Sequence, residues 1–174
     1  MATMVSTSTV AGPMLQELRE EAATTKRILN CVPADKLAWK PHTKSMTLGQ
    51  LAGHIAGIPG RISKLAQQES FDVLKGSFAP PQPANLEEIL TTLDQGVREA
   101  EMFLQGLTDE SAAETFRLMK GDRELFHQPR SGIVRTIMLN HWYHHRGQLS
   151  VYLRLLDVAL PVIYGRSADT DPFA

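Results

Sequence analysis

The sequence predicts an all-α fold, a four-helix bundle whose helices are joined by long connections. Four stretches of about 20 residues carry apolar side chains at three- and four-residue steps, the pattern of an amphipathic helix. Their approximate ranges are residues 13–32, 47–65, 85–105 and 131–156. Connections of about 15 and 25 residues separate the later stretches, so crossovers are allowed and the order of the helices around the bundle is not fixed.

Length and composition are those of a single globular domain. A chain of 174 residues with 43% hydrophobic and 21% charged residues is long enough to bury a full core. We expect residues 1–12 to form a flexible leader and residues 13–174 to form the helical domain. The leader has neither the basic start nor the long apolar stretch of a secretory signal.

Charge and hydropathy exclude several classes of partner. The net charge of −1 and the scattered basic residues give no electrostatic footprint for a nucleic acid. No apolar run approaches the ~20 residues of a membrane span. Cys31 is the only cysteine, which rules out an intrachain disulfide and indicates a reducing, cytoplasmic setting. Its place at the end of a helical pattern suits a small buried hydrophobe better than a reactive thiol.

The first two helices have recognisable ends. Pro13 suits the first position of a helix, and Pro33 follows the last apolar residue of the same pattern. Thr47 and Gln50 have the spacing of a capping box at the start of the second helix. Pro59 lies inside the second pattern, so we expect a kink at this residue or a break just before it.

The middle of the chain is less regular. Residues 70–84 are rich in proline near their end and predict a long linker before the third helix. Residues 108–130 allow two interpretations. They form either a short helix near residues 110–113 or a hairpin in which residues 115–119 pair with residues 124–127.

Three histidines crowd into the last helix, and helical geometry separates them. At about 100° per residue, His145 lies about 40° from His141, whereas His144 lies about 60° away on the opposite side. The centre of the apolar stripe falls within about 10° to 20° of His141. His141 and His145 are therefore expected to point into the bundle, and His144 would replace His145 only in a rotated helix. By the same geometry Tyr143 faces solvent or a partner subunit.

The pattern predicts a metal site. Two histidines at positions i and i+4 can bind one ion, as in the HExxH zinc motif, although the residues between His141 and His145 include no glutamate. His54 borders the buried face of the second helix and is the best-placed third ligand. A lone histidine beside an apolar stripe is more often a core residue, but paired inward rings need partners for their nitrogens. Gln50 and Gln148 are candidate partners that would orient the rings.

Three neutral imidazoles would leave a divalent ion with an open position, which is typical of catalytic rather than structural zinc sites. Zinc and nickel suit imidazole, and iron is a further candidate. The remaining histidines, His42 and His127, are expected to have surface, capping or structural roles. No nucleophile motif, phosphate-binding loop or dinucleotide fingerprint is present.

Four segments of the chain form a specific pattern in this order and at this spacing. The strongest is NHWYHHRGQL, and the four segments are residues 32–42, 46–54, 140–149 and 161–169. Together they resemble the DinB/YfiT-like superfamily of metal-dependent four-helix-bundle proteins. The resemblance implies that one histidine of the second helix and two of the last helix bind the metal. In this chain they are His54, His141 and His145.

The resemblance also implies a class of function. Some relatives resemble transferases that activate low-molecular-weight thiols on the metal, and others resemble hydrolases or isomerases. We therefore expect a metal-dependent enzyme of the thiol transferase or hydrolase type that acts on a small molecule. The alternative is a non-catalytic, metal-stabilised bundle that serves as a stress-related interaction or binding module. The resemblance further implies a homodimer, with Tyr143 and Tyr164 as candidate contacts.

Overall fold

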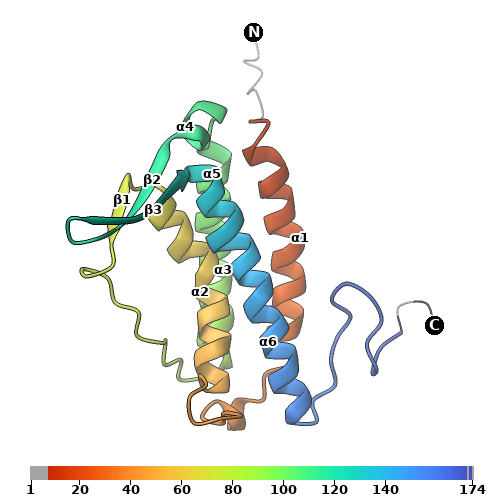
Figure 1. The fold of residues 1–174 in the computed structure, drawn as a ribbon. Helices are drawn as coiled ribbons and strands as arrows, with labels where there is room; N and C mark the ends of the chain where they lie inside the picture. The colour runs from red at the N-terminus through yellow and green to blue at the C-terminus, as the bar shows by residue number, and fades with distance from the viewer. Residues whose placement is uncertain (1–7, 172, 174) are drawn as a thin grey trace.

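Four long helical segments lie side by side in the computed structural model, which describes residues 8–171 and 173 (Figure 1). Figure 1 shows that the first and last segments run in one direction and the two middle segments in the other. The segments are α1 (Ala11–Leu29), α2 (Leu48–Ala66), α3 (Leu86–Gly106) and a continuous rod of α5 (Arg130–Ile133), the π-helix η2 (Val134–Asn140) and α6 (His141–Leu155). The four predicted helices are confirmed, and the connection between α2 and α3 is a crossover.

The start of α1 is tied to Asp109, the first residue of the short helix α4 (Asp109–Ala113). Residues 1–7 of the predicted leader lie outside the described residues. Residues 8–12 are held in place, since α1 begins at Ala11 and Asp109 accepts hydrogen bonds from Ser8, Thr9 and Val10. These bonds lower the pKa of the Asp109 carboxyl to about 2. The helix thus begins two residues before the expected position.

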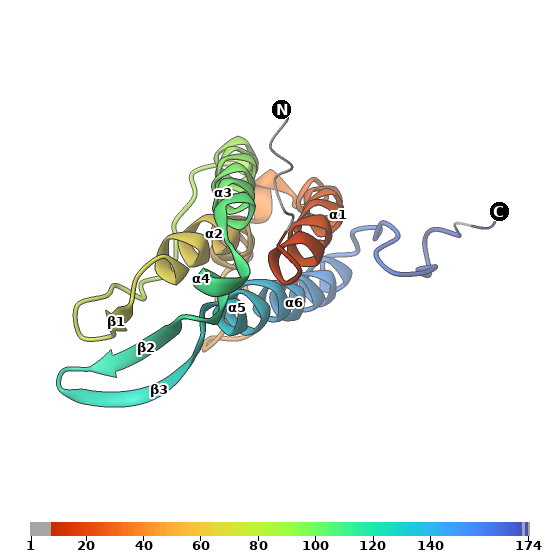
Figure 2. The same cartoon turned by 90° about the horizontal axis from the view of Figure 1, so that it is seen from above.

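A small sheet makes the all-α prediction incomplete. β1 (Ser70–Asp72) pairs in parallel with β2 (Thr115–Lys120), and β2 pairs antiparallel with β3 (Arg123–Pro129). Both alternatives for the middle of the chain are realised, because α4 (Asp109–Ala113) precedes the hairpin. Gly121 forms the turn with a φ of 58°, a conformation that glycine adopts without strain. Figure 2 shows the sheet to one side of the bundle, beyond α2 and α5.

The predicted linker at residues 70–84 is wrong at its start, where β1 forms. A three-residue strand is too short to show alternation, and its partner lies about 45 residues away in the sequence. The connection after β1 passes along α2, and two of its prolines pack on Gly53. An added Cβ at Gly53 would lie 3.1 Å from Pro81 and 3.3 Å from Pro83.

Pro59 does not break α2, which is continuous across it. Proline has no N–H to give to the carbonyl four residues before it, here that of Ile55. The indole Nε1 of Trp142 donates to this carbonyl at 3.0 Å, and the Trp142 ring is completely buried. The last helix therefore supplies the hydrogen bond that Pro59 cannot make.

Two glutamates of α1 bind the face of the last helix that was expected to lie outward. The hydroxyl of Tyr143 donates to Glu17 at 2.7 Å and its ring is partly buried, so the expectation that Tyr143 faces open solvent is wrong, whereas its contact with a partner subunit stays a prediction. Arg146 is 2% exposed and forms an ion pair of 2.5 Å with Glu21, beneath the ring of Tyr164. The last helix packs on α1 as well as α2, so its buried surface is wider than a single stripe.

No helix in the described part of the chain has both the length and the apolar character that a membrane span requires.

Candidate metal centre

Three histidines of α2 and α6 meet with their ring nitrogens converging. The Nε2 atom of His54 lies 3.2 Å from Nε2 of His141, which lies 3.2 Å from Nε2 of His145. One ligand atom from each ring falls within 4.8 Å of the others. The structure therefore brings together the three predicted residues, and their geometry is that of a group that could hold a metal ion.

The spacing of the nitrogens fits a tetrahedral ion. A zinc–imidazole bond of about 2.05 Å and tetrahedral angles place two ligand nitrogens about 3.3 Å apart. Both Nε2 pairs at 3.2 Å match this distance. The rings are nearly perpendicular, with angles of 82° and 89° between the plane of His141 and those of its two neighbours, so they meet at their edges rather than stack.

The π-helix before α6 lies within the stretch of the rod on which two isoleucines and the two histidines share one face. Ile133, Ile137, His141 and His145 follow one another at four-residue steps, and all four line the same cleft. In an α-helix each such step drifts by about 40° around the axis. The wider turn of η2, between Val134 and Asn140, reduces this drift, and π-turns of this kind are frequent at functional sites.

Gln148 orients one of the rings. Its Oε1 can only accept, so Nδ1 of His145 is the donor of their 2.7 Å hydrogen bond. The proton on Nδ1 leaves Nε2 of His145 with a lone pair, which is the form that binds a metal. The predicted role of Gln148 beside a candidate ligand ring is thus supported by the structure.

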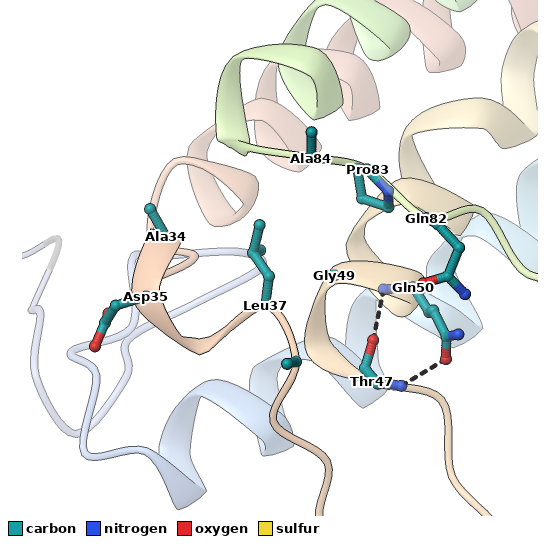
Figure 3. Close-up of a pocket in the computed structure, with 10 residues that line it drawn as sticks. Ala34, Asp35, Leu37, Thr47, Gly49, Gln50, Gln82, Pro83 and Ala84 are labelled. Carbon is teal, nitrogen blue, oxygen red and sulfur yellow. Dashed lines mark hydrogen bonds between the residues drawn. The ribbon is translucent and has the colours of Figure 1, made fainter.

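Gln50 has a different role from the one expected. The side-chain Oε1 of Gln50 accepts from the backbone N–H of Thr47 at 2.9 Å, and the backbone N–H of Gln50 donates to the Thr47 hydroxyl (Figure 3). This reciprocal pair is the predicted capping box, which begins α2. The side chain is therefore used at the helix end, and among the described residues it forms no hydrogen bond with a histidine ring.

Arg61 is the residue beside the site that the sequence patterns missed. Its Nη2 atom lies 3.3 Å from Nδ1 and 3.0 Å from the carbonyl oxygen of His54. Arginine only donates, so Nδ1 of His54 accepts and Nε2 of His54 carries a proton that points at His141. The lone pairs of His141 and His145 then face each other at 3.2 Å. With neutral rings, this pattern of hydrogen bonds leaves the lone pair on Nε2 of His145 without a donor. A cation bound to all three Nε2 atoms would interact with a lone pair from each ring.

Burial keeps the imidazoles neutral. Burial, with the charges of His145 and Arg61 as smaller causes, lowers the pKa of His54 to about 4. The pKa values of His141 and His145 are also lowered, and burial is again the first cause. A neutral ring is the form that coordinates a metal, so at neutral pH none of the three rings carries the second proton that would prevent binding, and His54 needs only to move its proton from Nε2 to Nδ1.

Acidification should destabilise the metal-free protein between pH 6.5 and about 4. In this window the unfolded chain binds a proton on His54, whereas the folded ring, with its lowered pKa, does not. The stability that depends on neutral His54 is complete above pH 6.5 and is lost as the pH falls towards 4. Thermal unfolding of chelator-treated protein across this window measures the loss. The His54→Gln variant should show a shallower decline, and an unchanged decline would contradict the assignment.

A cleft of about 630 Å³ opens onto the three histidines. It lies between α2, the sheet and the rod formed by α5 and η2, and its volume is typical of a small-molecule site. Its walls are mainly apolar and include the side chains of Ile58, Ile62, Phe71, Phe116, Leu118 and Ile137. The sheet thus forms one wall of the cleft, and of its strands only β1 was not among the sequence-based alternatives.

The other described histidines are not part of the converging group, although the ring of His144 lies edge-on to that of His145, with 4.9 Å between their centroids. His144 is exposed, so the alternative in which it replaces His145 is not realised. His42 accepts a hydrogen bond from the backbone of Lys44, and His127 bonds to Glu124 on the hairpin. A second hollow of about 390 Å³, at the start of α2, is the one drawn in Figure 3, and no histidine lines it.

Comparison with known proteins gives the same fold. The structure resembles that of a DinB-like protein from Bacillus cereus, with a TM-score of 0.66 and 24% identity over 87% of this chain and 95% of that one. It also resembles DinB-like YjoA of Bacillus subtilis, with a TM-score of 0.67 and 16% identity over 89% and 99% of the two chains.

Sequence comparison gives the family. The uncharacterized protein YrdA of Bacillus subtilis (strain 168) is 26% identical over 145 residues, which are 83% of this chain and 82% of YrdA. The profile that describes the DinB family matches residues 4–171, nearly the whole chain. The chain belongs to the DinB family.

Proposed function

We propose that the protein is a metal-dependent transferase that joins a low-molecular-weight thiol to an apolar small molecule. The observation that carries the proposal is the apolar cleft of about 630 Å³ that opens directly onto three converging imidazoles. His54, His141 and His145 would hold the ion, with zinc and nickel as the metals best suited to them. A divalent ion supplies a Lewis acid there, which lowers the pKa of a thiol or of water.

The lining of the cleft favours a thiol over water as the nucleophile. No carboxylate lines the cleft among the residues that the structure describes, and its histidines are the three proposed ligands. Hydrolysis of an amide needs a general base and an acid for the leaving group. A thiol, with an ordinary pKa near ~8.5, loses its proton without such a base. The hydrolase alternative is therefore the weaker one.

The residues of the chain have separate tasks in this reaction. The imidazoles stay neutral and fix the site of the thiol sulfur, and Gln148 holds the ring of His145 in orientation. The apolar walls bind the body of the electrophile and exclude water from it. The sulfur forms a bond to the electrophilic carbon, the leaving group departs with the electrons of the broken bond, and the thiol proton passes to solvent.

Thiol conjugation by zinc-loaded protein tests the proposal. Monochlorobimane is a small, largely apolar electrophile that becomes fluorescent when a thiol displaces its chloride. With cysteine or glutathione as the thiol, the wild-type protein should accelerate the reaction. Chelator-treated protein and the His145→Ala variant should not. Hydrolysis of aryl esters without conjugation would favour the hydrolase, and a fourth protein ligand on the metal would favour the non-catalytic bundle.

A further inference from the structure

We propose that Arg61 is an anion receptor at the rim of the cleft, so that the protein binds amphiphiles with an apolar body and one anionic group. This inference rests on the proposed function, since it places the body of the substrate in the cleft beside the three histidines. It adds the chemical class of the substrate and a residue that selects it. The anionic group is a carboxylate, a sulfonate or a phosphate, which guanidinium binds through paired donors.

Arg61 is the one permanently charged side chain among the described residues that line the cleft. Its guanidinium lies against α2 over Gly57, where an added Cβ would collide with Nη1. The glycine therefore leaves room for the charged group to lie beside His54, while the residue as a whole stays exposed. The helix thus presents a cation at a cavity whose other described lining residues are apolar apart from the three histidines and Ser77.

No carboxylate of the described chain pairs with this cation. Ion pairs within 4.0 Å join Arg135 to Glu17 and Arg146 to Glu21, but none involves Arg61. Glu99, on the facing helix, binds Lys64 at 3.0 Å and Gln95 at 3.2 Å instead. The guanidinium thus keeps donors available for an acceptor that arrives from outside the described chain.

Metal binding would increase the need for such an acceptor. When Nε2 of His54 binds a metal, the neutral ring carries its proton on Nδ1, the atom that now accepts from Arg61. Two donors would then face each other across 3.3 Å, because arginine cannot accept. An anion between them accepts from both, as carboxylates do beside many metal-bound histidines. The described residues supply no such group here, so we expect the anionic group of the substrate to accept these hydrogen bonds.

A matched pair of fluorescent probes tests the inference on the zinc-loaded, full-length protein. The first probe is 8-anilinonaphthalene-1-sulfonate, and the second is N-phenyl-1-naphthylamine, which has the same aromatic body without the sulfonate. The Arg61→Gln variant should bind the sulfonate about 10- to 100-fold more weakly, the usual range for a lost charge-assisted contact, and the neutral probe as the wild type does. The control Arg98→Gln removes an exposed charge of α3 outside the cleft and should change neither affinity.

Two results would overturn the inference. The first is an unchanged affinity of Arg61→Gln for the sulfonate probe, and the second is an equal loss of affinity for both probes. Either would show that Arg61 does not bind the anionic group. Melting curves of each variant confirm that the fold is retained, and elemental analysis reports its zinc content. If the wild type bound no zinc but still preferred the sulfonate through Arg61, the proposed metal function would fail and the anion receptor would stand.

Discussion

Replacing His141 by alanine should weaken zinc binding by more than about 100-fold. Loss of a residue that only orients a ligand typically costs 10- to 100-fold in metal affinity, and loss of a ligand costs more. His141 is the central ring, since its Nε2 atom lies 3.2 Å from that of each neighbour. Competition with a chromophoric chelator measures the affinity, and elemental analysis of the purified proteins checks the metal content.

His144→Ala is the matched control for this experiment. It removes an exposed histidine from the same helix, three residues from His141, and leaves the converging nitrogens in place. Its zinc affinity should equal that of the wild type. Equal metal content in wild type and His141→Ala would end the proposal that these histidines form the site.

Removing the indole of Trp142 should give the largest loss of stability. Trp142→Ala deletes a completely buried ring, a change that costs about 3–5 kcal/mol of unfolding free energy. Trp142→Phe keeps much of the ring but leaves the Ile55 carbonyl without its donor, which costs about 1–3 kcal/mol. Urea denaturation of the metal-free protein measures both values.

A double-mutant cycle with Pro59 isolates the hydrogen bond from the packing. Pro59→Ala restores the backbone N–H that the Ile55 carbonyl lacks, so Trp142→Phe should cost less in this background. Trp39→Phe serves as a control, because Trp39 packs edge-on against Tyr152 and its indole has no hydrogen bond within the described residues. A cost of Trp142→Phe that does not depend on residue 59 would contradict the account.

The helices and the three histidines could be predicted because both depend on local periodicity. The stripe around His141 sets the inward face of the last helix, and His145 shares that face one turn later. The capping box at Thr47 was equally local and is confirmed. Tyr143 was misplaced for the same reason, since a stripe analysis assumes one packing partner and this helix has two.

The rest of the site depends on contacts between distant parts of the chain. β1 forms only because β2 lies beside it, and the wall around Phe116 is created by this pairing. Arg61 is a local exception, since it lies seven residues after His54 on the same helix, but an analysis of apolar stripes does not show the conformation of a charged side chain. The π-turn before His141 has no signature in an apolar pattern with four-residue steps. Topology, rather than propensity, therefore determines the cleft.

X-ray absorption at the zinc edge of the metal-loaded wild-type protein tests the central claim most directly. The account predicts three imidazole nitrogens and one light atom from solvent, all about 2.0–2.1 Å from the ion. That result would establish both the ligands and the open position that the proposed chemistry needs. Fewer than three imidazoles, or a sulfur ligand at about 2.3 Å, would contradict the assignment of His54, His141 and His145.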